Sequence, residues 1–239
     1  MWSGPRNIST AMMRSWGARS DTVVIDEPLY AHYLDKTGFD HPGAKEVLQT
    51  HERDWQKVVQ ELTGVVPEGK SIWFQKHMTH HMLDNIDRTW TLNLTNVFLV
   101  RSPASMLASL VQIVPNPTIE QTGLPQQLEL FNLISQHTGT SPPVIDAKDV
   151  LQQPRRTLST LCACIGVPFV DDMLLWKQGP RKTDGIWAKH WYAGVEDSTE
   201  FAPYVDKDSC LPSRLTSLAR ECDTYFDALI EFRVESSAC

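Results

Sequence analysis

Short apolar segments alternate with helix-like segments along this 239-residue chain, and this alternation constrains the fold more than any other feature. Four segments have the length and the β-rich composition of buried strands. They are residues 22–26, 71–74, 96–100 and, more weakly, 143–145. Because helical patterns separate them, the sequence predicts an α/β fold with three layers, in which helices cover both faces of a mostly parallel sheet.

Composition limits the classes of protein that this chain can be. No Pro/Gly/Ser-rich linker divides residues 1–239, so a single domain is expected. The net charge of −7 argues against a nucleic-acid partner, which would need a basic face. The apolar stretch at 97–114 is too interrupted to span a membrane, and the N-terminus lacks a secretory pattern, so a cytoplasmic protein is expected. Five cysteines without a CxxC pair indicate thiols rather than a metal site.

The segment SGPRNIST, at residues 3–10, combines a basic side chain with the start of a helix that runs from about Ser9 to Arg19. Backbone N–H groups at a helix N-terminus, with the Arg6 guanidinium and two hydroxyls nearby, can bind a phosphate. The alternative is a Ser/Thr cap after a Gly/Pro turn. Only Met1 and Trp2 precede Ser3, so the strand expected before such a loop is either very short or incomplete.

A second candidate pair, Arg101 and Ser109, follows the strand at 96–100. If a helix begins near Pro103, the two residues lie about two turns apart and can converge on one anion. The alternative is a helix-terminal arginine with an unrelated serine. In parallel sheets ligands bind at the carboxyl ends of the strands, which is where both candidate clusters fall.

Together the two segments resemble P-loop sulfotransferases that use 3′-phosphoadenylyl sulfate (PAPS). PRNIST, at residues 5–10, is similar to the loop that binds the 5′-phosphosulfate in that family, and Arg101 with Ser109 is similar to its 3′-phosphate pair. The segments 144–169 and 179–191 also resemble later parts of the family's sequence. The resemblance implies a P-loop type of fold and a nucleotide site formed by these residues: Arg6, Asn7, Ile8, Ser9, Thr10, Arg101, Ser109 and, in the late loop, Arg181 and Lys182.

The resemblance also implies catalytic roles. Arg6 is expected at the leaving phosphate and the transferring group, and Glu27 or His77 is expected to act as the base, with Lys76 assisting the sulfuryl group. Each of these also has a plain alternative: Glu27 as a solvated turn residue and His77 as a surface histidine. Ile8 departs from the family pattern because glycine usually stands there, and a β-branched residue does not readily adopt a positive φ.

The sequence therefore predicts an enzyme that transfers a sulfuryl group from PAPS to a hydroxyl of a small-molecule acceptor, releases 3′,5′-adenosine bisphosphate and needs no metal. Two alternatives stay open: a P-loop kinase-like phosphotransferase, and a catalytically inactive nucleotide-binding protein. Trp187, Trp191 and Tyr192 either line an acceptor pocket or belong to the core, and the core is expected for two of the three. Acceptor identity and oligomeric state are not predicted.

Overall fold

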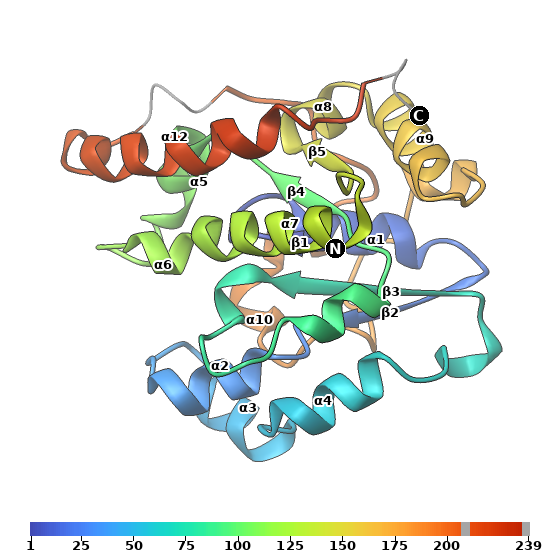
Figure 1. The fold of residues 1–239 in the computed structure, drawn as a ribbon, viewed down its shortest axis with the longest axis horizontal. Coiled ribbons are helices and arrows are strands. Elements are labelled where there is room, and N and C mark those ends of the chain that lie inside the picture. The colour runs from blue at the N-terminus through green and yellow to red at the C-terminus, as the bar shows by residue number, and fades with distance from the viewer. Residues whose placement is uncertain (207–210, 236–239) are drawn as a thin grey trace.

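In the computed structural model, which describes residues 1–206 and 211–235, one parallel sheet organises the molecule (Figure 1). Within this part of the chain the sheet has five strands in the order β2-β3-β1-β4-β5. They are β1 (Trp2–Ser3), β2 (Thr22–Asp26), β3 (Ile72–Met78), β4 (Phe98–Val100) and β5 (Val144–Asp146). All four neighbouring pairs are parallel, so every carboxyl end lies at the same edge of the sheet.

The helices connect and surround these strands. The α-helices are α1 (Ser9–Gly17), α2 (Tyr30–Thr37), α3 (Ala44–Thr50), α4 (Trp55–Leu62), α5 (Pro103–Leu110), α6 (Ile119–Thr122), α7 (Leu124–Thr138), α8 (Ala147–Gln152), α9 (Pro154–Cys164), α10 (Ala188–Trp191), α11 (Ala193–Glu196) and α12 (Thr216–Ile230). The 3-10 helices are η1 (Pro67–Gly69), η2 (Thr79–His81), η3 (Thr89–Asn93), η4 (Asp171–Leu174) and η6 (Ser213–Leu215).

Alternate residues of the central strands enter cores on opposite faces of the sheet. Leu99 of β4 packs in a cluster with residues of α1 and α9, whereas Phe98 and Val100 pack in a cluster with residues of α7 and α12. This follows from the period of two in a strand, which sends successive side chains to opposite faces. Both faces are therefore covered, and the predicted α/β class with its parallel sheet is confirmed (Figure 1).

The central strand β1 has only two residues, Trp2 and Ser3. It pairs with β3 on one side and β4 on the other. Gln127 of α7 supports this junction, because its side-chain amide donates hydrogen bonds to the carbonyl oxygens of Trp2 at 3.1 Å and Leu99 at 2.9 Å. The loop after β1 is thus held in the middle of the sheet edge.

Three expectations need correction. β3 is longer than the predicted strand at 71–74 and continues to Met78, so Lys76 and His77 lie within a strand rather than after it. The helical region expected at about 44–62 is two helices, α3 and α4, because Asp54 caps a new helix start through its side chain. Cys162 and Cys222 are free and buried, but Cys164 is disulfide-bonded, so the expectation of thiols is wrong there.

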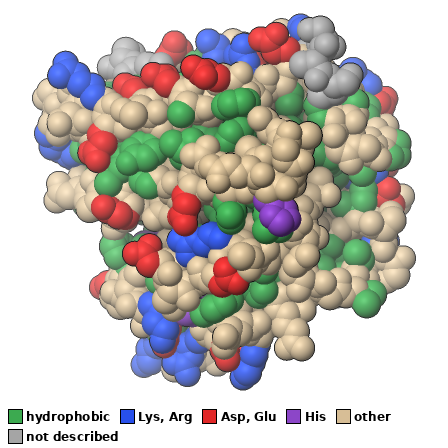
Figure 2. Space-filling view, viewed as in Figure 1, with side chains coloured by type: hydrophobic (Ala, Val, Ile, Leu, Met, Phe, Trp, Pro, Cys, Tyr) green, Lys and Arg blue, Asp and Glu red, His purple; other side chains and the backbone are tan. Residues whose placement is uncertain are grey.

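The surface and the helix lengths add two observations. On the face drawn in Figure 2, acidic and basic side chains are interspersed and no broad basic region is visible. Among the described residues, none of the helices combines the length and the apolar character needed to cross a membrane. Nor do these residues include a group of three or more His, Cys, Asp or Glu side chains that could hold a metal ion.

Candidate active site

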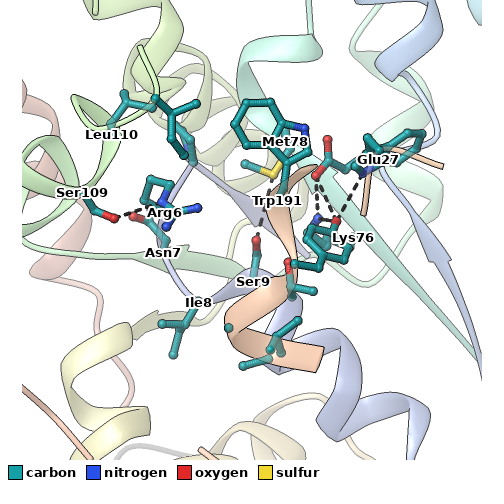
Figure 3. Close-up of a pocket in the computed structure, with 18 of the residues that line it drawn as sticks. Arg6, Asn7, Ile8, Ser9, Glu27, Lys76, Met78, Ser109, Leu110 and Trp191 are labelled. Carbon is teal, nitrogen blue, oxygen red and sulfur yellow. Dashed lines mark hydrogen bonds and ion pairs between the residues drawn. The ribbon is translucent and has the colours of Figure 1, made fainter. Parts of the chain in front are cut away.

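A cavity of about 410 Å³ opens at the carboxyl edge of the sheet and joins the segments that the sequence singled out. The loop after β1, the ends of β2 and β3, and helix α5 all contribute to its wall. In Figure 3, Arg6 and Ser109 lie at one end of the drawn site, and Glu27 and Lys76 lie at the other. We call these the arginine end and the carboxylate end.

The loop that feeds α1 has an unusual backbone. Arg6 and Ile8 both adopt left-handed conformations, with φ of 63° and 62°. Such a conformation is strained for a β-branched residue and costs on the order of 1–3 kcal/mol. Ile8 thus adopts the positive φ that glycine usually takes at this position in the resembling family, and the chain accepts the strain that a β-branched residue brings to it.

Helix α1 begins without a side-chain cap, because Ile8 precedes it and has no group that can accept a hydrogen bond. By contrast, Asp54, Ser102 and Asp146 cap α4, α5 and α8 through their side chains. The first N–H groups of a helix have no partner within it and carry the positive end of its dipole. The α1 terminus at this cavity can therefore donate hydrogen bonds to an anion.

Gly4 allows a neighbouring segment to approach this loop. A Cβ at this position would lie 2.5 Å from the carbonyl oxygen of Thr122 in α6, a distance at which backbone would have to move. The small residue thus permits α6 to pack directly against the loop.

Arg6, Arg101 and Ser109 meet at the arginine end, although Arg6 is separated from the other two by 95 and 103 residues in the chain. The Arg6 Nε donates a hydrogen bond to Ser109 Oγ at 3.0 Å, and the Arg101 Nη1 donates one to the Arg6 carbonyl oxygen at 2.7 Å. All three line the cavity, as do Asn7, Ser9 and Thr10. Two guanidinium groups, a hydroxyl and an uncapped helix terminus are suited to bind phosphate.

Lys76 organises the carboxylate end. Its Nζ is almost fully buried and donates hydrogen bonds to Asp26 Oδ1 at 2.8 Å, to Glu27 Oε1 at 2.6 Å and to the Tyr192 hydroxyl at 2.7 Å. The Tyr192 hydroxyl in turn donates to Asp26 Oδ2 at 2.7 Å. Register explains the meeting of the strand residues, because Asp26 of β2 pairs directly with Lys76 of β3.

The electrostatics of this network favour a charged lysine and a carboxylate of raised basicity. Burial alone would lower the pKa of Lys76, but Asp26 and Glu27 outweigh it and hold that pKa well above its ordinary value. Burial raises the pKa of Glu27, while the Lys76 charge opposes this rise. A buried carboxylate with a raised pKa is a stronger proton acceptor than an exposed one.

His77 does not face this cavity. Because strand side chains alternate, Lys76 and Met78 point into the cavity while His77 lies against the other face of the sheet. There its ring stacks on Trp2 with centroids 4.4 Å apart, and burial lowers its pKa well below the ordinary value. This corrects both expectations for His77: it is not a surface histidine, and its position does not suit a base beside Glu27.

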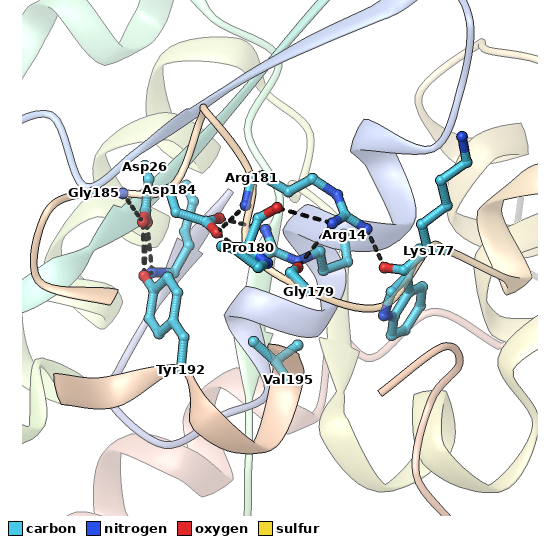
Figure 4. A network of polar contacts seen from close by, with 12 residues as sticks. Arg14, Asp26, Lys177, Gly179, Pro180, Arg181, Asp184, Gly185, Tyr192 and Val195 are labelled. Carbon is cyan, nitrogen blue, oxygen red and sulfur yellow. Dashed lines mark hydrogen bonds and ion pairs between the residues drawn. The ribbon is translucent and has the colours of Figure 1, made fainter. Parts of the chain in front are cut away.

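Arg181 and Lys182 are also outside the cavity and line a separate hollow beside α1. The Arg181 guanidinium donates to carbonyl oxygens of its own loop, among them that of Gly179 at 2.8 Å. Asp184 holds the loop instead, by accepting from the Arg181 backbone N–H at 2.7 Å and pairing with Arg14 (Figure 4). The geometry therefore corrects the expectation that these two cations contact a nucleotide in the main cavity.

Asp26 and His81, which sequence reasoning missed, belong to the carboxylate end, and so does Tyr192, which the sequence offered for a pocket or the core but not as a partner of Lys76. Asp26 and Tyr192 complete the Lys76 network, and His81 Nε2 lies 4.0 Å from Glu27 Oε2. Asp26 could have been found, because a strand-terminal acid directly before Glu27 is a signal of the same kind. No local signal marks Tyr192, which comes from the distant segment after α10.

The three late aromatics have mixed roles. Trp187 and Tyr192 are buried, as the core expectation requires for two of the three, while Trp191 is half-buried. All three nevertheless line the cavity. Core and pocket are therefore not exclusive alternatives for these residues, because buried rings also form part of the pocket wall.

Two curated proteins from Arabidopsis thaliana are similar to this chain in sequence. "Branched-chain-amino-acid aminotransferase-like protein 1" is 38% identical over 202 residues, which cover 84% of this chain and 36% of that protein. "Branched-chain-amino-acid aminotransferase-like protein 2" is 33% identical over 228 residues, which cover 95% of this chain and 40% of that protein. The chain therefore spans about two fifths of the length of these relatives.

Solved structures with a similar fold are sulfotransferases. The sulfotransferase domain from the Synechococcus PCC 7002 olefin synthase superposes with a TM-score of 0.58 at 16% identity, covering 95% of this chain and 92% of that one. The sulfotransferase from Alicyclobacillus acidocaldarius superposes with a TM-score of 0.51 at 14% identity, covering 99% and 96%. At these identities the likeness shows a shared fold.

The family model described as "Sulfotransferase domain" matches residues 1–219, which include β1, the loop before α1, and both ends of the cavity. A match over most of the chain, together with the shared fold, extends the resemblance seen in the two anion-binding motifs. The chain belongs to the family of sulfotransferase domains.

Proposed function

We propose that this protein transfers the sulfuryl group of PAPS to a hydroxyl of a small-molecule acceptor. The observation that carries the proposal is that Arg6, Arg101 and Ser109 meet in one cavity that also holds Glu27 and Lys76. A doubly phosphorylated donor needs two groups of cations and donors, and an acceptor hydroxyl needs a base. Both requirements are met within one site.

The residues at the arginine end fit the chemistry of the donor. The uncapped N-terminus of α1, with Ser9 and Thr10, would bind the 5′-phosphosulfate, and Arg101 with Ser109 would bind the 3′-phosphate. Arg6 bonds to Ser109 and lies beside the loop, so its guanidinium can stabilise charge on the leaving phosphate. These contacts would hold the donor still during the reaction.

Glu27 is the residue suited to accept the acceptor's proton. In the proposed step the acceptor oxygen forms a bond to sulfur while the bond from sulfur to the bridging phosphate oxygen breaks. The acceptor proton passes to Glu27, and the electron pair of the broken bond leaves on 3′,5′-adenosine bisphosphate. Lys76 holds Glu27 in place at 2.6 Å, and its charge opposes the rise of the Glu27 pKa, which favours the ionised form that can accept a proton.

The same geometry favours sulfuryl transfer over the kinase alternative. A P-loop kinase uses an acidic residue near a strand end to hold Mg²⁺. Here both strand-terminal acids, Asp26 and Glu27, accept hydrogen bonds from Lys76, and a buried ammonium group repels a second cation. The loop at residues 3–10 also lacks the lysine of the kinase motif.

A thermal-shift titration with 3′,5′-adenosine bisphosphate tests the proposal. The bisphosphate should raise the melting temperature of the parent protein, because a ligand stabilises the state that it binds. Arg101→Ala should lose most of this shift, and Arg181→Ala should retain it because Arg181 lies outside the cavity. Equal shifts in the parent and in Arg101→Ala would remove the assignment, and a shift with Mg²⁺-ATP alone would favour the kinase.

Turnover is then measured with PAPS and a panel of alcohols and phenols. Sulfated product from the parent supports an enzyme, whereas bisphosphate binding with no transfer to any acceptor supports the inactive nucleotide-binding alternative.

A single domain over residues 1–239 and a cytoplasmic location complete the proposal. Limited proteolysis that leaves one protected fragment would support the single domain.

A further inference from the structure

Aromatic rings form the wall of the cavity around the carboxylate end. They come from α2 and the segment after it, from η2, and from α10, and His81 Nε2 lies 4.0 Å from Glu27 Oε2. The rings used in the argument below are those of Tyr30, Tyr33, Phe39, His41, His81 and Trp191, all of which line the cavity. The arginine end has no comparable set, so the two ends suit chemically different guests.

These rings support one another in fixed orientations. Tyr30 stacks on His81 with centroids 5.0 Å apart and an interplanar angle of 13°. Phe39 meets His41 edge to face at 4.6 Å, and His41 meets Trp191 at 5.9 Å and 64°. The Tyr30 hydroxyl and His41 Nδ1 are also hydrogen-bonded at 2.7 Å. Rings that line a cavity and pack on one another both stacked and edge to face favour a flat aromatic guest, which can join such packing.

The wall offers no cation to an anionic guest. Burial lowers the pKa of His81 well below its ordinary value, and burial also lowers that of His41, so both are neutral at pH 7. Lys76 is the cation of this end, and Asp26 and Glu27 already pair with it. An anionic acceptor would therefore lose its hydration without gaining a partner at this end.

We propose that the acceptor is an alcohol with a flat aromatic body and no negative charge, held by this ring wall with its hydroxyl toward Glu27. The inference rests on the proposed sulfuryl transfer and adds the chemical class of its acceptor. It follows from the ring geometry together with the pairing of Lys76, and it predicts discrimination by charge and by flatness.

Three benzyl-type probes of similar size separate these properties. They are para-isopropylbenzyl alcohol, its para-carboxy analogue, and the cyclohexyl analogue of the neutral compound. With PAPS, kcat/KM for the neutral aromatic probe should exceed that of each other probe by about tenfold or more. Equal or better use of the carboxylate or the cyclohexyl compound would overturn the inference.

Binding measurements distinguish failure of the inference from failure of the proposed function. If bisphosphate does not bind and PAPS is not consumed, the proposed function fails. Thermal shifts by the three probes alone still test the wall, and a shift by the neutral aromatic compound that is no larger than the others contradicts the inference. If bisphosphate binds normally but the neutral probe neither binds nor reacts, only the acceptor class is wrong.

A pair of arginine substitutions gives a matched control. Phe39→Arg places a cation in the wall, so it should lower kcat/KM for the neutral probe and raise it for the para-carboxy probe, which changes their ratio by about tenfold. Val65→Arg adds the same charge at a position that is 92% exposed and outside the cavity, and it should leave the ratio unchanged. Bisphosphate binding should be the same in both, and an unchanged ratio in Phe39→Arg with that binding intact would overturn the inference.

Discussion

The two ends of the cavity differ in how far they are assembled before any ligand arrives. At the carboxylate end, Lys76 already makes three short hydrogen bonds within a network that is nearly closed to solvent. At the arginine end, Arg6 is exposed to the cavity and bonds a serine hydroxyl, and the helix beside it begins without a cap. The first is a finished charge network, and the second has donors available for a guest.

This difference indicates a division of labour. Groups that are fixed in advance lower a reaction barrier without reorganising during the reaction, which suits the step at the acceptor. The Arg6 guanidinium, which bonds a neutral hydroxyl, suits a ligand that binds and leaves on every turnover. Substitutions at the carboxylate end should therefore affect turnover or stability, and substitutions at the arginine end should affect donor affinity.

Glu27→Gln should give the largest change. The amide keeps the shape of the side chain but cannot accept the proton, so kcat should fall by about 10²–10⁴. Steady-state turnover with PAPS and the best acceptor measures this. Bisphosphate affinity in the same variant should stay close to that of the parent. A large loss of affinity without a fall in kcat would show that Glu27 acts in donor binding and that the two ends do not have separate roles.

Lys76→Met should have the next largest effect, on stability. It leaves Asp26 and Glu27 buried beside each other without their cation, which should lower the free energy of unfolding by about 3–5 kcal/mol at neutral pH. Urea unfolding measures the loss. Lys36→Met is the control, because its pair with Asp35 is exposed and should contribute under about 1 kcal/mol. Similar losses in both variants would contradict the view of a finished network.

Arg6→Ala should act on donor affinity instead. Loss of a charge-assisted hydrogen bond costs about 1.5–3 kcal/mol, so bisphosphate should bind roughly 10–150-fold more weakly while unfolding in urea changes little. Isothermal titration calorimetry gives the affinity. Arg53→Ala serves as control, since Arg53 pairs with Asp35 on the surface. A variant that binds bisphosphate as tightly as the parent would show that Arg6 does not contact the donor.

The sequence predicted the sheet well because its signal is local. Strand β2 has the predicted bounds, since a short β-rich run ends at Glu27 and Pro28. Strand β3 exceeds its prediction because Gln75, Lys76 and His77 are polar residues that a hydrophobic pattern reads as the end of a strand. Their burial depends on tertiary partners, such as the Leu62 carbonyl that accepts from Gln75.

The arginine end was predictable for a similar reason, and the carboxylate end only in part. Spacing within single segments indicated Arg6, Arg101 and Ser109, and the geometry brings them together. Tyr192 reaches the site only through the path of a long late segment, which local pattern does not specify. Arg181 was predicted as a nucleotide-binding residue from its type and its position in the late loop. In the structure its guanidinium instead donates to a carbonyl oxygen of that loop.

A pH titration of stability should detect the neutral histidine of the carboxylate end. Burial lowers the pKa of His81 in the folded state, so below about pH 6.5 the unfolded chain binds a proton that the folded protein does not. Stability should therefore fall as pH decreases below 6.5, by about 1.4 kcal/mol per unit from this residue. His81→Phe keeps the ring against Tyr30 and should flatten the slope, whereas His137→Phe, at an exposed position, should not. Equal slopes in the parent and His81→Phe would show that His81 titrates normally.

The smallest effect concerns the loop at the arginine end, where strain and side-chain loss can be separated at one residue. Ile8→Ala and Ile8→Gly both remove the side-chain packing, but only glycine adopts a φ of 62° without strain. Ile8→Gly should therefore be about 1 kcal/mol more stable than Ile8→Ala in urea unfolding. In the interior of α1 the order should reverse, with Ala11→Gly less stable than the parent by about 1 kcal/mol. If glycine were the less stable residue at both positions, the left-handed conformation of Ile8 would carry no strain, and the arginine end would be as relaxed as the network opposite it.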